Sequence, residues 1–333
     1  MRRCLECLSR QILRPDETIV VDASADDQTR EVVATFADVV YLRNREGAGR
    51  MTTSRNISLH HCHGDVIAFL DDDAFAEPQW LKELLSTYID TSIGGVGGRA
   101  SNQVAGEESY RVSELGRLKS NGELAGYFAG DPGGVIEVDH VMGCNMSFRR
   151  SVLARLGGFR EDYPGISGVC EDSDMCIRVR ALGYRILFNP KAKVDHIGAK
   201  QAVGQRFDAR YAFYGQRNHL VLLVRNFGFR FVGPYLLHSI WRDLRQFVGR
   251  FWRATKAVGY AFAIVMADAA GSVCGIVVGA ALLRRYGREP ARIDENGRKI
   301  SEALEAERHP NAPQNFLHNV DNDVISNWES NGA

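Results

Sequence analysis

Apolar and polar positions form short alternating blocks through the first two thirds of the chain. Brief apolar runs predict buried strands, and the stretches between them have the spacing of amphipathic helices. Strands that alternate with helices predict an α/β fold with a parallel sheet covered by helices. The predicted strands are 18–22, 39–42, 66–70, 135–141 and 144–148, and the predicted helices are 27–36, 51–62, 78–89 and 175–182.

The strand predicted at 66–70 ends in three acidic residues, Asp71, Asp72 and Asp73. Ligand chemistry in open α/β sheets is found at the carboxyl ends of strands. Packed carboxylates repel one another, so we expect a cation among them. Hard oxygen ligands suit magnesium or manganese, and such ions usually keep substrate phosphates as further ligands. A solvated acidic turn is the alternative that these residues alone leave open.

A second acidic cluster, 170–174, opens the helix predicted at 175–182, which ends at Gly183. Acidic side chains in a first turn complement the helix dipole, and glycine just past a helix end is a usual cap. Helix stability therefore explains this cluster as well as a function does.

The pattern changes from Pro234 onward. Apolar residues between Leu237 and Trp252 have helical spacing, and arginines occupy the other faces. A basic amphipathic helix with tryptophans is typical of a membrane surface, although a helix packed on the preceding domain has the same pattern. The apolar stretch 257–283 is interrupted by Asp268, so we expect it to lie on a membrane or pack against protein rather than span.

Composition narrows the class of protein. The chain has 333 residues, 45% hydrophobic and 25% charged, which suits a soluble-type protein with one large core and an appendage. Lys plus Arg and Asp plus Glu both number 41, and this balance argues against a nucleic acid partner. Seven scattered cysteines favour a reducing compartment over a disulfide framework. No apolar segment follows Met1-Arg2-Arg3, so we expect a cytoplasmic protein.

Several segments, in this order and spacing, resemble the family 2 glycosyltransferases. The resemblance covers about residues 1–226 and implies a GT-A fold, a Rossmann-like, mostly parallel sheet, with a nucleoside-diphosphate sugar as donor. We therefore expect a catalytic domain at 1–230, and the residue pattern predicts amphipathic and apolar helices at 231–288 and a polar flexible tail at 289–333. The segments are Cys7-Leu8-Ser9-Arg10-Gln11, Ile19-Val20-Val21-Asp22, Ser54-Arg55-Asn56-Ile57, 64–73, 143–150, Gly157-Gly158-Phe159, Glu171-Asp172, Gly183-Tyr184-Arg185 and Val194-Asp195-His196.

The resemblance also implies which residues bind the donor. Asp22, at a strand end, would contact the nucleobase or ribose. The permanent charge of Arg55 would lie near the nucleotide. Asp71 and Asp73 match the family's D-x-D pair, with Asp71 directed towards the ribose, and Asp72 between them is grouped with the donor-binding residues.

Three residues are implied in the chemistry. Asp73 would hold a divalent metal, magnesium or manganese, with His196, which matches a histidine after the last core strand, as a second ligand. The metal would neutralise charge on the departing diphosphate. Asp172 matches the general base, which takes the proton of the acceptor hydroxyl. One base and no covalent nucleophile imply a single displacement with inversion.

The resemblance fails at the N-terminus, because family members begin with an apolar strand and turn that are absent before Cys4-Leu5. We therefore expect a sheet that lacks its first strand. We hypothesise that translation starts further upstream and adds roughly ten residues, enough for one strand and a turn. An in-frame stop codon just before Met1 in the encoding DNA would rule this out.

The sequence thus predicts a metal-dependent inverting glycosyltransferase that acts on a hydroxyl of a glycan or lipid-linked acceptor, with peripheral contact to the inner face of the cell membrane. A nucleotide-sugar-binding or scaffold protein, impaired by the missing strand, is one alternative. A phosphohydrolase of the haloacid dehalogenase type is another, disfavoured because Phe75 stands where that motif has Thr or Val.

Overall fold

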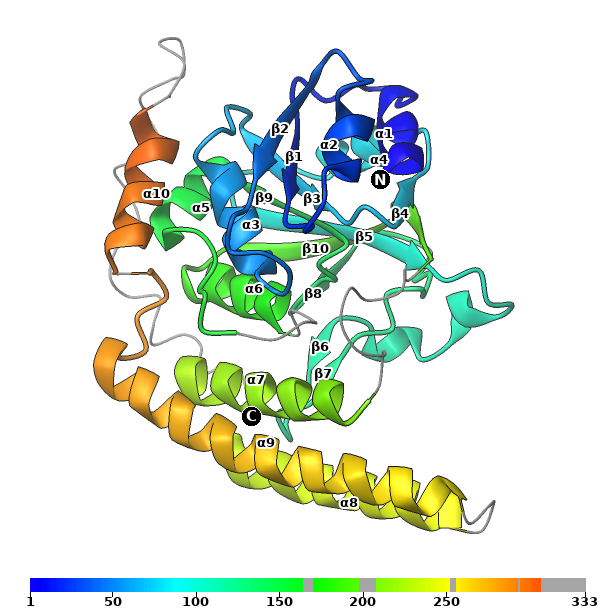
Figure 1. The fold of residues 1–333 in the computed structure, drawn as a ribbon, viewed down its shortest axis with the longest axis vertical. Helices are drawn as coiled ribbons and strands as arrows, with labels where there is room; N and C mark the ends of the chain where they lie inside the picture. Colours follow the sequence, from blue (N-terminus) through cyan, green and yellow to red (C-terminus); the bar gives the residue numbers. More distant parts are fainter. Residues whose placement is uncertain (164–169, 198–207, 252–255, 293, 307–333) are drawn as a thin grey trace.

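A mixed α/β domain with a central sheet is followed by a C-terminal helical region in the computed structural model, which confirms the expected class (Figure 1). The structure describes residues 1–163, 170–197, 208–251, 256–292 and 294–306, and side chains except those of 246–261. The strands are β1 Thr18–Asp22, β2 Val39–Arg43, β3 Val66–Leu70, β4 Ala74–Ala76, β5 Ile93–Ser101, β6 Arg117–Leu118, β7 Leu124–Ala125, β8 Ile136–Val138, β9 Asn145–Arg149 and β10 Arg185–His196. The helices are α1 Arg2–Ser9, α2 Gln28–Val33, α3 Met51–Leu59, α4 Trp80–Ser86, α5 Arg150–Leu156, α6 Glu171–Ala181, α7 Ala209–Phe227, α8 Val232–Phe251, α9 Lys256–Tyr286 and α10 Glu295–Ala306.

The central sheet has the order β3-β9-β5-β10-β4, with β8 also paired to β10. The prediction of a mostly parallel sheet is wrong, because most pairs of neighbouring strands in this sheet are antiparallel. Strand β9 runs antiparallel to both β3 and β5, and only β5 and β10 form a parallel pair within this sheet. The reason is that β9 is reached through the long segment 102–144 rather than through a helix, so the crossover that enforces parallel pairing is absent there.

Strands β1 and β2 form a separate parallel pair. Among the described residues, no strand pairs with the outer edge of β3 or joins β1 to it. This arrangement agrees with the expectation of a sheet without its first strand.

The two faces of the sheet have different covers. Ile67 and Phe69 of β3 face a core that α3, α5 and α6 complete, whereas Val66, Ala68 and Leu70 face α4. Side chains alternate across a strand, so one short apolar run supplies both cores. The elements that carry the site therefore have rigid packing on both sides.

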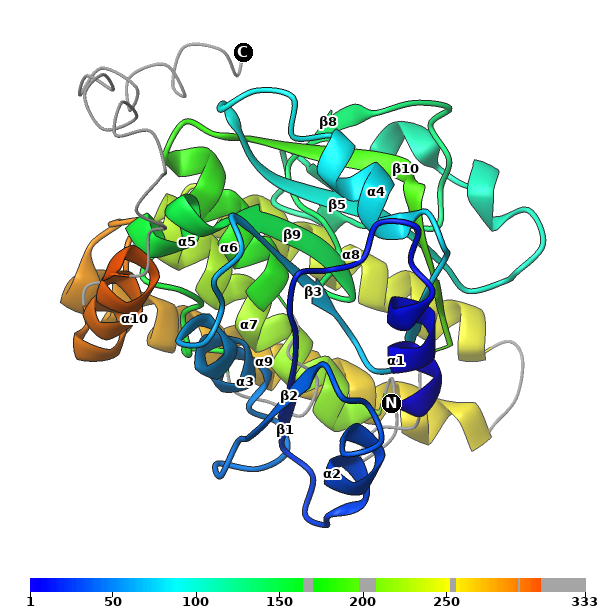
Figure 2. The ribbon, with the colours of Figure 1, turned by 90° about the horizontal axis from the view of Figure 1, so that it is seen from above.

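Helix α7 leads from the α/β domain into the helical region. It packs along its length against α9, and α8 and α9 lie on the side of α7 away from the sheet (Figures 1 and 2). The sequence placed residues 209–227 within the catalytic domain, yet their buried side chains, from Leu220 to Val224, share a core with α8 and α9. We therefore treat α7 as the joint between the two parts.

The prediction of a flexible polar tail from residue 289 is wrong for residues 295–306, which form α10. Ile300 and Leu304 lie four residues apart on one face of α10 and are buried against α3 and α5. Arg178, which is fully buried, donates hydrogen bonds to the carbonyls of Leu156, Gly158 and Pro290, and so attaches the segment before α10 to the core. Two apolar residues in a polar stretch were too weak a signal to predict this helix. Residues 307–333 lie outside the described part of the chain.

Substitution of Ile300 by alanine tests the packing of α10. Ile300→Ala is expected to lower the free energy of unfolding by about 2–5 kcal/mol, because it leaves a cavity in the main core. Urea denaturation measures this change. Lys299→Ala, one residue away and 60% exposed, should change the value by less than about 0.5 kcal/mol. Equal, small effects of both substitutions would show that α10 is not part of the folded core.

Candidate active site

Antiparallel pairing of β4 with β10 brings the first group of predicted site residues together. Strand β4 follows directly on Asp71–Asp73, and His196 at the end of β10 lies opposite Ala74. The N–H of Ile197 donates to the carbonyl of Asp73 at 3.1 Å, which extends the pairing by one residue. His196 Nε2 thus lies 3.4 Å from Asp73 Oδ1.

Asp71, Asp73 and His196 each offer one ligand atom, and these atoms all lie within 4.8 Å of one another. Two carboxylate oxygens and an imidazole nitrogen suit magnesium or manganese. Burial raises the pKa of Asp71; the Arg55 charge opposes this, and the Asp73 charge adds to it. A divalent cation would relieve the repulsion between the two carboxylates, so the donor set fits the metal that the sequence predicted.

Arg55 of α3 connects this cluster to the acidic end of α6. Its Nη1 lies 2.9 Å from Glu171 Oε1, and its Nη2 lies 3.9 Å from Asp71 Oδ1. The side chain is only 8% exposed. Burial disfavours its charge, but the surrounding carboxylates outweigh burial, and the pKa of Arg55 is raised. One buried cation therefore holds two acidic segments, distant in sequence, at the same point.

Asp172 is fixed by two backbone N–H groups. The N–H of Gly143 donates to Oδ2 at 2.8 Å, and the N–H of Ser173 donates to Oδ1 at 2.7 Å. Arg55 Nη2 donates to the carbonyl of Gly143 at 3.4 Å. A Cβ on Gly143 would lie 2.8 Å from Arg55 Nη2 and 3.3 Å from Asp172 Oδ2, so a larger residue here would displace the guanidinium. Gly143 thus couples the arginine to the predicted base.

Two residues at the site were missed from the sequence as functional residues. Glu171 is buried, and its Oε2 has no hydrogen-bond partner in the described structure. Burial, and then the charge of Asp172, raise the pKa of Glu171 to about 8 even though Arg55 opposes this. His140 is also buried, with Nδ1 3.0 Å from Ser173 Oγ, and burial lowers its pKa. The position of Glu171 beside Asp172 was a usable signal, whereas nothing in the sequence distinguished His140.

Other predicted residues lie differently. Asp22 is buried and accepts hydrogen bonds from the Ser24 N–H, Tyr41 and Arg43 at 2.7–2.8 Å. Burial opposes its charge, but these partners lower the pKa of Asp22. The Asp72 side chain is 63% exposed and lies 3.6 Å from the Met1 amino group, outside the metal-ligand cluster. The donor-binding roles of Asp22 and Asp72 stay predictions.

Asn145 has a structural role. It is fully buried, accepts a hydrogen bond from Trp80 Nε1 at 2.8 Å and donates to the carbonyls of Arg99 and Ala192. These contacts join β9 to α4 and to neighbouring strands. Both side-chain N–H bonds of Asn145 are thus used within the protein.

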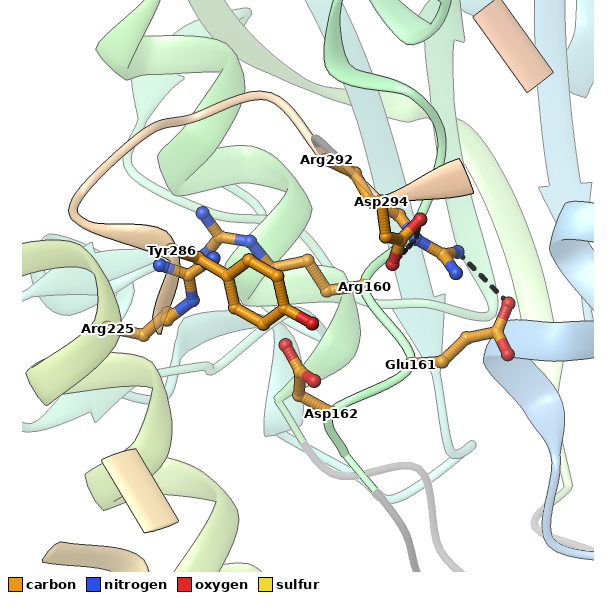
Figure 3. Close-up of a pocket in the computed structure, with 7 residues that line it drawn as sticks. All are labelled: Arg160, Glu161, Asp162, Arg225, Tyr286, Arg292 and Asp294. Carbon is orange, nitrogen blue, oxygen red and sulfur yellow. Dashed lines mark hydrogen bonds and ion pairs between the residues drawn. The ribbon is translucent and has the colours of Figure 1, made fainter. Parts of the chain in front are cut away.

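A polar pocket of about 90 Å³ lies elsewhere, where the segment before α10 meets the α/β domain and α7 (Figure 3). Arg292 pairs with Glu161 at 3.0 Å and Asp294 at 2.8 Å, and Arg160 donates to the Glu289 carbonyl at 2.6 Å. These contacts fasten the C-terminal segment, and none of the predicted site residues takes part. The lining residues are Arg160, Glu161, Asp162, Arg225, Tyr286, Arg292 and Asp294.

Comparison with known proteins gives matches at the level of family. Residues 1–157 match the model of glycosyl transferase family 2. A glucosyl-dolichyl phosphate glucuronosyltransferase from Haloferax volcanii is 31% identical over 202 residues, which cover 58% of this chain and 62% of the relative. A pre-mycofactocin glycosyltransferase from Mycobacterium tuberculosis is 31% identical over 205 residues, which cover 61% of this chain and 42% of the relative. The chain thus spans less than two thirds of the length of either relative.

Among solved structures, the chain aligns with a mannosyltransferase from Pyrobaculum calidifontis in complex with GDP-Man and Mn²⁺. The alignment has a TM-score of 0.48 and 19% identity, and it covers 91% of this chain and 81% of the other.

The raised pKa of Glu171 gives a pH dependence of stability. Between about pH 4.5 and 8 the unfolded chain has released the Glu171 proton while the folded chain retains it, so the free energy of unfolding should fall as pH rises. Glu171→Gln is expected to reduce this fall, as measured by urea denaturation across that range. Glu305→Gln, an exposed carboxyl on α10, serves as the control. The same pH slope in Glu171→Gln as in the parent protein would contradict a protonated, buried Glu171.

Proposed function

We propose that this chain, whose residues 1–157 match the model of glycosyl transferase family 2, belongs to that family and transfers a sugar, with inversion, from a nucleoside-diphosphate donor to an acceptor hydroxyl. One observation carries the proposal: Arg55 contacts Asp71 of the metal-ligand cluster and also the Gly143 carbonyl, whose N–H holds Asp172. A donor-binding group and a carboxylate base therefore share one small network. Both are needed for direct displacement at an anomeric carbon.

Asp172 is proposed as the general base. Its two backbone hydrogen bonds fix the carboxylate while each oxygen keeps lone pairs for a further proton. An acceptor hydroxyl within hydrogen-bond reach would pass its proton to this carboxylate as its oxygen attacks the anomeric carbon. The structure offers no second carboxylate in a comparable position within the described residues, because Glu171 is buried against Arg55. This division of roles favours a single displacement.

Asp73 and His196, with Asp71 beside them, are proposed to hold magnesium or manganese. When bound, the ion would supply positive charge against the diphosphate that leaves the sugar. Asp71 is held by Arg55 at 3.9 Å, which leaves its other oxygen for the donor ribose. Asp22 and Asp72 are proposed as further donor contacts, as the family resemblance implies.

The acceptor is proposed to be a glycan or lipid-linked hydroxyl at the cytoplasmic face of a membrane. One curated relative has glucosyl-dolichyl phosphate in its name. The α/β domain also continues, through α7, into helices with exposed apolar side chains. These features support an acceptor carried by a membrane.

Donor binding is tested by a panel of UDP-, GDP- and dTDP-sugars, each with and without manganese, in thermal-shift measurements. At least one donor is expected to raise the Tm only when the metal is present, because ligand binding to the folded state stabilises it. Asp73→Ala should abolish this shift. Asp65→Asn should retain it, because Asp65 is an exposed carboxyl directly before Val66, at the end of β3 opposite to the acidic run. A metal-independent shift that Asp73→Ala leaves intact would contradict the proposed site.

Substitution of the base separates catalysis from donor binding. Asp172→Asn keeps the shape of the side chain but removes its basicity, so sugar transfer is expected to fall about 10²–10⁴-fold. The metal-dependent Tm shift with the donor should persist. Transfer at the parent rate in this variant would rule Asp172 out as the base. A parent protein that binds donors but transfers no sugar to any acceptor would instead favour a binding or scaffold role.

A further inference from the structure

Helix α9 has its apolar and polar sides reversed relative to a helix of an ordinary soluble protein. Phe262, Met266, Val273 and Val277 repeat at helical spacing, and each is more than half exposed. The alanines between them are exposed too, so the outer face has no polar side chain from 262 to 281. Residues 262–286 are also long and apolar enough to cross a membrane, yet only 22% of the most apolar window is buried. Water is a poor solvent for such a face.

The polar side chains of this region lie inside it. Asp268 of α9 is buried and accepts a hydrogen bond from Arg242 of α8 at 3.0 Å. Gln216 of α7 donates to Ser239 of α8 at 3.1 Å and to Ser272 of α9 at 3.0 Å. Three helices are therefore joined by a buried hydrogen-bonded network beside their shared apolar core, while further apolar side chains of α8 and α9 face outward. This distribution is the one expected of helices whose outer surroundings are lipid.

Helix α8 continues the apolar surface. Leu237, Ile240, Trp241 and Leu244 follow the i, i+3, i+4, i+7 spacing of one helix face, and each is more than half exposed. Trp241 has Arg245 at 5.4 Å from its ring. Tryptophan beside arginine is typical of the level where lipid headgroups meet the acyl chains.

Helix α9 is held in place by a row of glycines. A Cβ on Gly271 would lie 2.5 Å from the Phe213 carbonyl, and one on Gly275 would lie 2.6 Å from the Arg217 carbonyl. The α9 backbone thus packs directly on α7, which in turn contacts α6 of the α/β domain. An α9 that crossed the bilayer would have to leave this contact and carry Asp268 into the hydrocarbon. An α9 that lies flat on the membrane keeps its contact with α7 and leaves Asp268 buried in protein.

The net positive charge of the helical region indicates which partner covers its exposed apolar faces. Between Gly228 and Arg288 the chain has nine Lys or Arg residues and two acidic residues, Asp243 and Asp268. Arg242 contacts both of these acids at 3.0 Å, so their negative charge is partly offset locally. A second copy of this surface would meet it with the same positive charge. An anionic bilayer complements it.

We propose that the exposed apolar faces of α8 and α9, named here the α8–α9 surface, dock flat on a membrane that contains anionic lipids. The docking is argued from the helices alone. Its role, which is to bring the site to a membrane-borne acceptor, rests on the proposed function. Apolar side chains enter the boundary of the acyl chains, and the surrounding arginines bind lipid phosphates. Helix α6, which begins at Glu171 and Asp172, contacts α7, so docking places the site near the lipid surface.

Co-sedimentation of the full chain with vesicles tests the proposal. Binding to vesicles of phosphatidylglycerol and phosphatidylcholine at low salt is expected to exceed binding to pure phosphatidylcholine at least 10-fold, and to weaken as salt rises. The double variants Val273→Glu/Val277→Glu and Leu237→Glu/Ile240→Glu should each lose at least 10-fold in affinity. Ile89→Glu/Val135→Glu, which changes exposed apolar residues outside the helical region, should bind like the parent protein.

Two further measurements keep the proposal open to refutation. The metal-dependent Tm shift with nucleoside diphosphate should persist in all three double variants, which shows that they fold. Asp73→Ala should bind vesicles normally, so a failure of the proposed catalysis is distinguishable from a failure of docking. The proposal is overturned if the parent protein ignores anionic vesicles, if the glutamate variants bind as the parent does, if alkaline carbonate fails to release the protein, or if size-exclusion chromatography shows a dimer that the glutamate variants abolish.

Discussion

The buried charge of Arg55 is the interaction on which the rest of the site depends. Asp71 and Asp172 come from segments about a hundred residues apart in sequence, and their charges would repel one another without a cation between them. Helix α3 places the guanidinium between the two acidic segments. Phe69 and Phe159 flank it, with their ring centres 6.0 and 5.4 Å from its Cζ, and they exclude water. The arginine is thus the structural centre of the site as well as a possible contact to the donor.

Much of this arrangement could be predicted from the sequence, because short-range patterns specify it. The strands at 18–22, 39–42 and 66–70 were placed nearly residue by residue, and the structure gathers Asp71, Asp73, His196 and Arg55. Each of these lies at the end of an apolar run or on a helix with a recognisable neighbourhood. Short sequence windows were therefore enough to predict these strands and site residues.

The parts that could not be predicted depend on contacts between distant segments. The antiparallel direction of β9 is set by the path of the segment 102–144, which has no periodic pattern. Helix α10 is stabilised by burial of Ile300 and Leu304 in a core made by residues before 190. His140 reaches the site only through its contact with Ser173. None of these partners is visible within a sequence window.

The α/β domain and the helical region differ in the side chains that they expose. In the α/β domain, apolar side chains fill the interior and charged ones gather at one edge of the sheet. In the helical region, a buried polar network lies beside an apolar core, and further apolar side chains face outward. Helix α7 joins the two because one side contacts α6 and the other receives the glycines of α9. The proposed sugar transfer and the proposed membrane docking are therefore linked through α7.

A crystal structure of the protein with a nucleoside diphosphate and manganese would test the central claim most directly. The account predicts an anomalous manganese peak within about 2–2.5 Å of an Asp73 oxygen and of a His196 nitrogen. It also predicts that the diphosphate lies on that ion, with Asp172 facing the same space. A manganese ion bound at other residues, or a nucleotide remote from Asp71 and Asp73, would contradict it.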